Sequence, residues 1–234
     1  MDIKDLHSGM QEGHFWLYAK RVMIDMLMRM ATQKNHLNIL NIGAGTGEDL
    51  KIIASYGMLT AIDIDVVTVA LMPDDVVNKK LVADACNMPF QNAEFDVIVA
   101  FDVLEHIERD GQAVAEVFRC LKPGGVFVFS VPACTFLFSK HDELLGHVRR
   151  YNKPMIKKLL HSFTMTYINY WFFLLFVPAA FVRLVLRNKI SNGTVGSYCN
   201  KIFGFVLRIE NWCLQKGIRY PWGLSLIGIA TKRN

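Results

Sequence analysis

The chain has 234 residues, of which 52% are hydrophobic, and a formal net charge of +5. This length and hydrophobic content support one sizeable core and exclude an intrinsically disordered protein. The positive charge is concentrated at one end: residues 183–234 contain nine Lys or Arg and one acidic residue, Glu210, whereas residues 1–182 contain 17 basic and 20 acidic residues. A basic tail is typical of proteins that contact nucleic acid or an anionic membrane surface.

Cysteine usage and the first residues indicate the compartment. The five cysteines form no C-x-x-C pair, so we expect neither a disulfide framework nor a zinc site. The first five residues, Met1 to Asp5, lack the apolar core of a signal peptide. We therefore expect reduced thiols and a cytoplasmic location.

The first two-thirds of the chain alternate between helical and strand patterns. Apolar side chains at helical spacing from Phe15 to Met30 predict an N-terminal helical cap over residues 1–36. A second helical pattern runs from Val103 to Leu121, and Lys122-Pro123-Gly124-Gly125 should end it. Short apolar runs predict strands at 37–43, 59–64, 80–83, 95–101 and 126–131. The alternation predicts a doubly wound α/β fold with its ligand beyond the carboxyl ends of the strands.

The remainder of the chain is more apolar. Residues 162–182 contain no charge and are long enough for a transmembrane candidate. We favour instead a strand over 165–170 and a helix over 171–186, because a membrane span would separate a final strand at 224–232 from its sheet. A helical pattern over 198–212 places aromatic residues on one side and cations on the other, as in an interfacial helix. An ordinary amphipathic helix on a soluble core is an equally open interpretation.

These patterns predict one domain over residues 1–234. Its cofactor-binding core would span 37–170, and an apolar helical insertion over 171–217 would form a lid or a membrane dock. Residues 218–234 would supply the final strand and the tail. A membrane span within the insertion is the less favoured alternative.

A glycine-rich turn follows the first predicted strand. Gly43, Gly45 and Gly47 alternate with Ala44 and Thr46, and Asp63 comes 20 positions after Gly43. A buried strand that turns sharply under a ligand needs glycine, because a Cβ would block the turn and the approach. The later acid suits a ribose, whose two hydroxyls can both donate to one carboxylate. The spacing is G-x-G-x-G, whereas dinucleotide-binding turns prefer G-x-G-x-x-G.

Three further segments strengthen this interpretation: Val82-Ala83-Asp84-Ala85, Phe95 to Phe101 followed by Asp102-Val103-Leu104-Glu105-His106, and Leu121 to Gly125. In this order the chain resembles the class I S-adenosylmethionine-dependent methyltransferases, particularly the type 11 group, over about residues 14–162. The resemblance implies a seven-stranded sheet whose last strand is antiparallel. It also implies S-adenosyl-L-methionine as the cofactor and S-adenosylhomocysteine as the product.

The resemblance further implies a role for particular residues. Gly43, Ala44, Gly45 and Gly47 would lie against the methionine part of the cofactor, Asp63 on the ribose, Ile64 beside the adenine, Asp84 and Ala85 at the adenine edge, and Phe101 near the sulfonium. A subgroup resemblance adds His14-Phe15-Trp16 and Arg21 ahead of the first strand, with Trp16 on the cofactor side and Arg21 available to the cofactor carboxylate.

Methyl transfer depends chiefly on holding the acceptor and the methyl group in near-attack geometry. A base is needed only for a protonated oxygen or nitrogen acceptor, and His106, His141 and His147 are the candidates. Asp102, Glu105 and His106 also resemble a metal-binding set in some quinone-precursor O-methyltransferases. The first position of that set is usually Glu, so we expect no metal here.

Arg149, Arg150 and Tyr151 follow His147, and their side chains suggest a substrate wall suited to phosphate or carboxylate. A solvated or carboxylate-paired surface is the open alternative for this pair of arginines. Because the apolar insertion follows, we predict a hydrophobic or lipid-like small-molecule acceptor with an anionic head group. We also expect a peripheral membrane surface at the inner face, no nucleic-acid partner, and an oligomeric state that the sequence leaves open.

Two rival functions remain open. One is a catalytically silent cofactor-binding module that serves as a membrane partner, since no residue in the sequence is by itself diagnostic of catalysis. The other is a nicotinamide-dependent reductase, which the glycine spacing and the segment from Leu121 to Gly125 disfavour.

Overall fold

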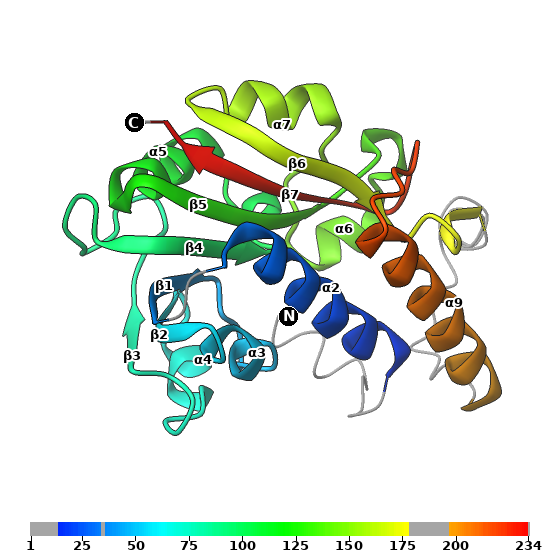
Figure 1. The fold of residues 1–234 in the computed structure, drawn as a ribbon, viewed down its shortest axis with the longest axis horizontal. Coiled ribbons are helices and arrows are strands. Elements are labelled where there is room, and N and C mark those ends of the chain that lie inside the picture. The colour runs from blue at the N-terminus through cyan, green and yellow to red at the C-terminus, as the bar shows by residue number, and fades with distance from the viewer. Residues whose placement is uncertain (1–13, 34–35, 178–196, 234) are drawn as a thin grey trace.

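A seven-stranded sheet forms the centre of the protein (Figure 1). The computed structural model describes residues 14–33, 36–177 and 197–233. The strand order is β3-β2-β1-β4-β5-β7-β6, and β1 to β5 run parallel to one another. β7 runs antiparallel to both β5 and β6. The predicted doubly wound sheet with an antiparallel last strand is therefore confirmed.

The strands are β1 (Leu37–Ile42), β2 (Gly57–Asp63), β3 (Lys79–Val82), β4 (Phe95–Phe101), β5 (Leu121–Pro132), β6 (Phe163–Trp171) and β7 (Ser225–Lys232). The described α-helices are α2 (Phe15–Ala31), α3 (Leu50–Ala54), α4 (Val66–Leu71), α5 (Asp110–Cys120), α6 (Lys140–Leu144), α7 (Lys153–Leu159) and α9 (Ser197–Gln215). Two short 3-10 turns, η1 (Leu104–His106) and η2 (Thr135–Leu137), complete the described elements.

Each face of the sheet has its own hydrophobic core. Successive side chains of a strand point to opposite faces, so Ile39 of β1 packs into one core and Leu40 into the other. Residues of α2, α3 and α9 fill the first core, and residues of α5 and α7 fill the second. Fully burying one such aliphatic side chain stabilises the fold by about 1.5–3 kcal/mol. The two layers fix the strand ends from which the site is built.

Two predicted boundaries around β4 and β5 are wrong. The helix expected from Val103 begins only at Asp110, because residues 104–106 form a tight 3-10 turn whose Leu104 and Glu105 are buried. Residues 122–125 end the helix as expected but already belong to β5, and the register between β4 and β5 is irregular there. The region between β4 and α5 is therefore not α-helical, and it forms a wall of the cavity described below.

The end of β6 corrects the predicted apolar insertion. β6 contains the expected strand at 165–170 and continues to Trp171, after which Phe172 adopts a left-handed conformation with φ +66°. The helix expected over 171–186 therefore does not begin at 171, and its residues from 178 onward lie outside the described part of the chain. None of the helices in the described ranges is long and apolar enough to cross a membrane. The boundaries of the domain and of its insertion stay predictions.

Candidate active site

A cavity of about 560 Å³ opens at the carboxyl ends of β1, β2 and β4. β1 lies between β2 and β4, so the connections leave it in opposite directions, and this is where doubly wound folds bind their ligands. The cavity brings together several residues that the sequence predicts for the site: Gly43, Gly45, Asp63, Ile64, Asp84, Ala85 and His106. The predicted glycine turn, both acids and one candidate base therefore meet in one place.

The turn after β1 needs glycine at its first position. Gly43 has φ +63°, and a Cβ there would lie 2.4 Å from Cγ2 of Val103. Two residues on, the N–H of Gly45 donates to Oδ2 of Asp63 over 3.0 Å, and Oδ1 of Asp63 accepts the N–H of Asp65 over 3.1 Å. Asp63 thus joins the turn to the end of β2. Because a carboxylate offers about four lone pairs, it can still accept ribose hydroxyls.

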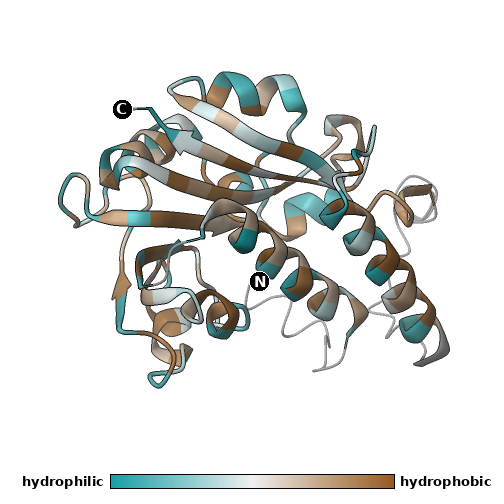
Figure 2. Cartoon of the chain, in the orientation of Figure 1, coloured by the Kyte–Doolittle hydropathy of each residue, from teal (hydrophilic) through white to brown (hydrophobic). Residues whose placement is uncertain are grey.

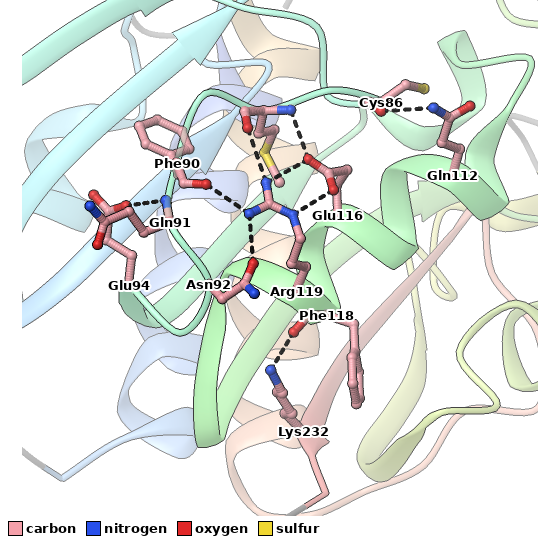
Figure 3. Close-up of polar contacts among 11 residues, drawn as sticks. Cys86, Phe90, Gln91, Asn92, Glu94, Gln112, Glu116, Phe118, Arg119 and Lys232 are labelled. Atoms are coloured by element: carbon pink, nitrogen blue, oxygen red, sulfur yellow. Dashed lines mark hydrogen bonds and ion pairs between the residues drawn. The ribbon is translucent and has the colours of Figure 1, made fainter.

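The loop after β3, which presents Asp84 to the cavity, is held from behind by Arg119 of α5 (Figure 3). The Arg119 guanidinium donates to the carbonyl oxygens of Met88 and Phe90 over 3.0 and 2.7 Å, and its Nε pairs with Glu116 over 2.7 Å. These contacts fix the loop backbone without help from a ligand. The wall expected to face the adenine is therefore preorganised.

A charge cluster around buried Lys20, beside the glycine turn, was not predicted from the sequence. Lys20 of α2 is 2% exposed, and its Nζ lies 2.9 Å from Oδ2 of Asp102 and 3.4 Å from Oδ2 of Asp49. Asp102 lines the cavity, and its Oδ1 accepts the hydroxyl of Ser130 over 2.8 Å. Burial opposes both charges, but the ion pairs outweigh it, raising the pKa of Lys20 and lowering that of Asp102. This cluster fastens α2 beside the cavity.

The sequence contained a signal for Lys20. It lies four residues after Trp16 and three before Met23, so it falls on the apolar stripe of α2, where a charge needs a buried partner. Its partners are Asp49, the N-cap of α3, and Asp102, directly after β4. A local sequence pattern does not identify them.

The metal set suggested by Asp102, Glu105 and His106 does not form, because Asp102 is engaged by Lys20. Glu105, His106 and His147 come together instead, each with one possible ligand atom within 4.8 Å of the others. Burial, aided by the charge of Asp102, raises the pKa of Glu105 well above its usual value and favours its neutral form.

The predicted wall of Arg149, Arg150 and Tyr151 is not formed. Arg150 and Tyr151 are 3% and 1% exposed, and the Arg150 guanidinium pairs with Asp142 over 2.6 Å. Arg149 pairs with Asp110 over 2.6 Å, and the Tyr151 hydroxyl lies 2.9 Å from the same carboxylate. Their polar groups bind the protein itself, so these residues brace the loop after β4 and do not face the cavity.

Three predicted cofactor residues lie around the cavity but are not among its lining. Ala44 follows Gly43 and packs partly buried against the core, and Gly47 has φ +95° with a Cβ direction blocked by Pro73. Phe101 is 5% exposed within the core under the end of β4. Their roles as cofactor contacts stay predictions.

The remaining predicted site residues lie further out. Trp16 is half-buried with Lys20 over its ring, 5.0 Å from the centroid, and Arg21 is exposed and donates to the carbonyl oxygen of Glu48 over 3.2 Å. Arg21 therefore lies beside the glycine turn, where the cofactor carboxylate is expected. His141 lies on α6 away from the cavity lining.

The antiparallel β7 is inserted between β5 and β6, and the cavity lies at the ends of β1, β2 and β4, as in the fold of class I S-adenosylmethionine-dependent methyltransferases. Residues 40–129 of the chain match the methyltransferase domain family. The resemblance inferred from the sequence is thereby confirmed, and S-adenosylmethionine is the cofactor.

Known proteins agree with this class. A probable S-adenosylmethionine-dependent methyltransferase of Mycolicibacterium smegmatis is 29% identical over 162 residues, or 66% of this chain and 60% of that protein. The 24-methylenesterol C-methyltransferase 2 of Arabidopsis thaliana is 26% identical over 53% of this chain and 37% of its own length. The chain thus spans less than two-thirds of the length of either relative.

A solved structure supports the fold. Phosphoethanolamine N-methyltransferase 2 of Haemonchus contortus, in complex with S-adenosyl-L-methionine, superimposes with a TM-score of 0.60 at 16% identity. The match covers 90% of this chain and 52% of that one.

The residues around the glycine turn fit the methionine end of the cofactor. Within the described ranges, Oγ1 of Thr46 and Oδ1 of Asp49 are buried without a hydrogen-bond partner. Leaving such an atom unpaired costs about 1–3 kcal/mol, so a bound donor is expected to satisfy it. The ammonium group of S-adenosylmethionine is such a donor, and an acidic neighbourhood suits its charge.

Proposed function

We propose that this protein transfers the methyl group of S-adenosylmethionine to a hydrophobic, lipid-like acceptor while it is docked on the inner face of a membrane. The methyltransferase class rests on the fold and the cavity described above. The acceptor and the membrane surface rest on α9, which is the observation that carries this proposal. An exposed apolar stripe runs along this helix beside the edge of the sheet at which the cavity opens.

The stripe consists of Ile202, Phe205, Ile209 and Trp212 and is called the α9 stripe below. Phe205 is 63% exposed and Trp212 57% exposed, which is unusual for aromatic side chains on a packed helix. Figure 2 shows hydrophobic and hydrophilic positions alternating along α9. Exposed cations flank the stripe at Lys201, Arg208 and Lys216. An apolar face bordered by cations suits the interface of an anionic bilayer.

The position of α9 relates the stripe to the cavity. β6 runs antiparallel to β7, which runs antiparallel to β5, so β6 ends at the same edge of the sheet as β4 and β5. At that end, the Trp171 indole N–H donates to Oδ1 of Asn211 over 2.9 Å, and the N–H of Phe173 donates to Glu210 over 2.9 Å. A membrane contacted by the stripe would therefore lie near the mouth of the cavity, so that an acceptor could reach it from the lipid.

The anionic head group expected from the sequence loses its support, because Arg149 and Arg150 are paired within the protein. Arg109 is an arginine that does line the cavity, unlike Arg149 and Arg150. The sterol named in the Arabidopsis relative is a hydrophobic acceptor of the kind proposed.

The cofactor supplies an electrophilic methyl group on a positively charged sulfur. The protein's part is to hold the acceptor in line with it, and His106, which lines the cavity, would accept a proton from an oxygen or nitrogen acceptor. No charged intermediate has to be stabilised, so orientation supplies most of the rate.

The test is transfer of label from methyl-labelled S-adenosylmethionine into a mixed lipid extract and, separately, into a water-soluble metabolite extract. We expect label in the organic phase, dependent on the protein. Label confined to the water-soluble extract would overturn the hydrophobic acceptor. Tight cofactor binding without transfer to either extract would favour the catalytically silent module.

A further inference from the structure

Asp142 is a buried carboxylate at the centre of a polar network that the mechanism above does not use. It is 0% exposed and lies in the first turn of α6. Its Oδ2 accepts the backbone N–H and the hydroxyl of Ser139 over 3.0 and 3.2 Å. Its Oδ1 lies 3.1 Å from Nδ1 of His147 and 2.6 Å from the Arg150 guanidinium. The carboxylate is thus oriented from four directions, and Arg150 balances its charge.

The chain around this network brings His147 to the wall of the active site. Gly146 adopts φ +80°, which lets the chain turn back after α6, and the N–H of His147 donates to the carbonyl oxygen of Asp142 over 2.8 Å. The next N–H, of Val148, donates to the carbonyl oxygen of Glu105 over 2.8 Å. His147 therefore lies against the 3-10 turn that carries His106. The two rings are edge to face, with centroids 4.8 Å apart.

The contact with Asp142 decides which nitrogen of His147 carries hydrogen. An ionised carboxylate only accepts hydrogen bonds, so Nδ1 must be the protonated nitrogen of neutral His147. Nε2 is then available as an acceptor. One ring nitrogen of His147 and one of His106 lie within 4.8 Å of each other, a gap that one water molecule can bridge.

We propose that Asp142 is a positioning residue of the methyl-transfer site, which fixes His147 in the Nδ1–H tautomer and so leaves Nε2 unprotonated on the ring that packs against His106. This inference rests on the proposed function. When a hydroxyl or amine acceptor is methylated, its bond to the methyl carbon forms as the carbon–sulfur bond breaks, and the electron pair of that bond goes to sulfur. The acceptor's proton goes to His106, which touches the acceptor, and then to Nε2 of His147. Asp142 stabilises the imidazolium that results.

The direct test is nitrogen NMR of the histidine side chains, at a pH two units above the usual imidazole pKa of about 6.5. A His147→Gln sample assigns the resonance. We expect the Nδ1–H tautomer of His147 in the unaltered protein, and its loss in the double variant Asp142→Asn with Arg150→Gln, which removes both buried charges together. Ser139→Ala removes one hydroxyl contact to the same carboxylate and should leave the tautomer unchanged. An Nε2–H tautomer in the unaltered protein, or no change in the double variant, would overturn the proposal.

A kinetic test separates positioning from folding. With the lipid extract as acceptor, kcat of the double variant should fall at least about tenfold, because a positioned proton acceptor contributes roughly 10²–10⁴-fold to the rate. The affinity of the same variant for S-adenosylhomocysteine should stay unchanged. If the double variant does not fold, His147→Gln must show the same result, a lower kcat with unchanged affinity for S-adenosylhomocysteine. An unchanged kcat in the variant that folds would overturn the role of Asp142. The NMR result does not need turnover, so failure of the proposed function would show separately, as loss of cofactor binding or transfer in the unaltered protein.

Discussion

Lys20, buried on α2, and Asp102, directly after β4, form an ion pair with 2.9 Å between Nζ and Oδ2, beside the glycine turn of the cofactor cavity. Asp49 completes the cluster from the other side, 3.4 Å from the same ammonium group. Lys20 is buried, whereas the Asp102 side chain is 27% exposed, so the ammonium group depends on these two carboxylates for its partners. The pair therefore couples the N-terminal helix to the strand end at which methyl transfer would occur.

Replacement of Lys20 should be costly and pH-dependent. Removing one partner of a buried pair costs about 3–5 kcal/mol, so we expect Lys20→Met to lower the free energy of unfolding by this amount at neutral pH. The pKa of Asp102 is lowered in the folded protein, so its contribution is present above its usual pKa of 3.8 and lost as pH falls through the folded value. In Lys20→Met the unpaired Asp102 should have a raised pKa, and acid should then favour folding.

The measurement is denaturant unfolding of both proteins between neutral pH and about pH 3.5, in steps across the usual range of carboxyl groups. The difference in stability should be largest at neutral pH and shrink below about pH 4. Arg29→Ala is the matched control, since Arg29 and Asp25 form a solvent-exposed pair at 2.8 Å that should contribute little to stability. A difference that does not vary with pH would contradict an ionic pair.

Gly43→Ala should damage the cofactor turn. The added Cβ would lie 2.4 Å from Val103 on a residue with φ +63°, so we expect a stability loss of about 1–3 kcal/mol and weaker binding of S-adenosylhomocysteine. Gly111→Ala is the control, because nothing lies within 4 Å of its Cβ direction in α5, and it should be neutral or stabilise by up to about 1 kcal/mol. Thermal melts and calorimetry on both variants check this. Equal effects of the two substitutions would argue against a sterically required turn.

The α9 stripe should control membrane binding and not folding. Phe205→Ser combined with Trp212→Ser removes two exposed aromatic side chains, so the melting temperature should change little. Burying such a side chain is worth about 1.5–3 kcal/mol, and each 1.4 kcal/mol is about tenfold in affinity. We therefore expect at least a tenfold weaker association with vesicles that contain anionic phospholipid, measured by co-sedimentation.

The control for the α9 stripe is a second pair of exposed apolar residues. Val67→Ser with Leu71→Ser, on α4, alters side chains that are 56% and 60% exposed and should leave vesicle binding intact. Equal vesicle binding by all three proteins would remove the membrane surface from the proposed function.

The parts of the site that the sequence predicted have local signals. Gly43 directly follows β1 and Asp63 is the last residue of β2, and a strand, a turn and an acid can be recognised without knowing the rest of the fold. The sheet topology followed because five short strands alternate with helices and the family resemblance supplied the order of the last two.

The parts that sequence analysis missed depend on partners far apart in the chain. Arg150 was expected to face substrate, but the turn at Gly146 places it on Asp142 inside the protein. Asp142 itself follows Ser139 by three residues, the spacing of a helix capping box, so its structural role had a signal. The contact of Oδ1 of Asp142 with His147 depends on the turn at Gly146. The geometry of that turn cannot be inferred from the spacing of residues in the sequence.

Calorimetric titration with S-adenosylhomocysteine and, in parallel, NADH tests the central claim most directly. The unaltered protein should bind S-adenosylhomocysteine and not NADH, and Asp63→Asn should lose at least about tenfold in affinity, since each 1.4 kcal/mol of lost ribose contact is about tenfold. Asp74→Asn, a surface acid paired with Lys80 away from the cavity, should bind as the unaltered protein does. Binding of NADH alone, or S-adenosylhomocysteine affinity that Asp63→Asn leaves unchanged, would contradict the assignment of this cavity as the cofactor site of a methyltransferase.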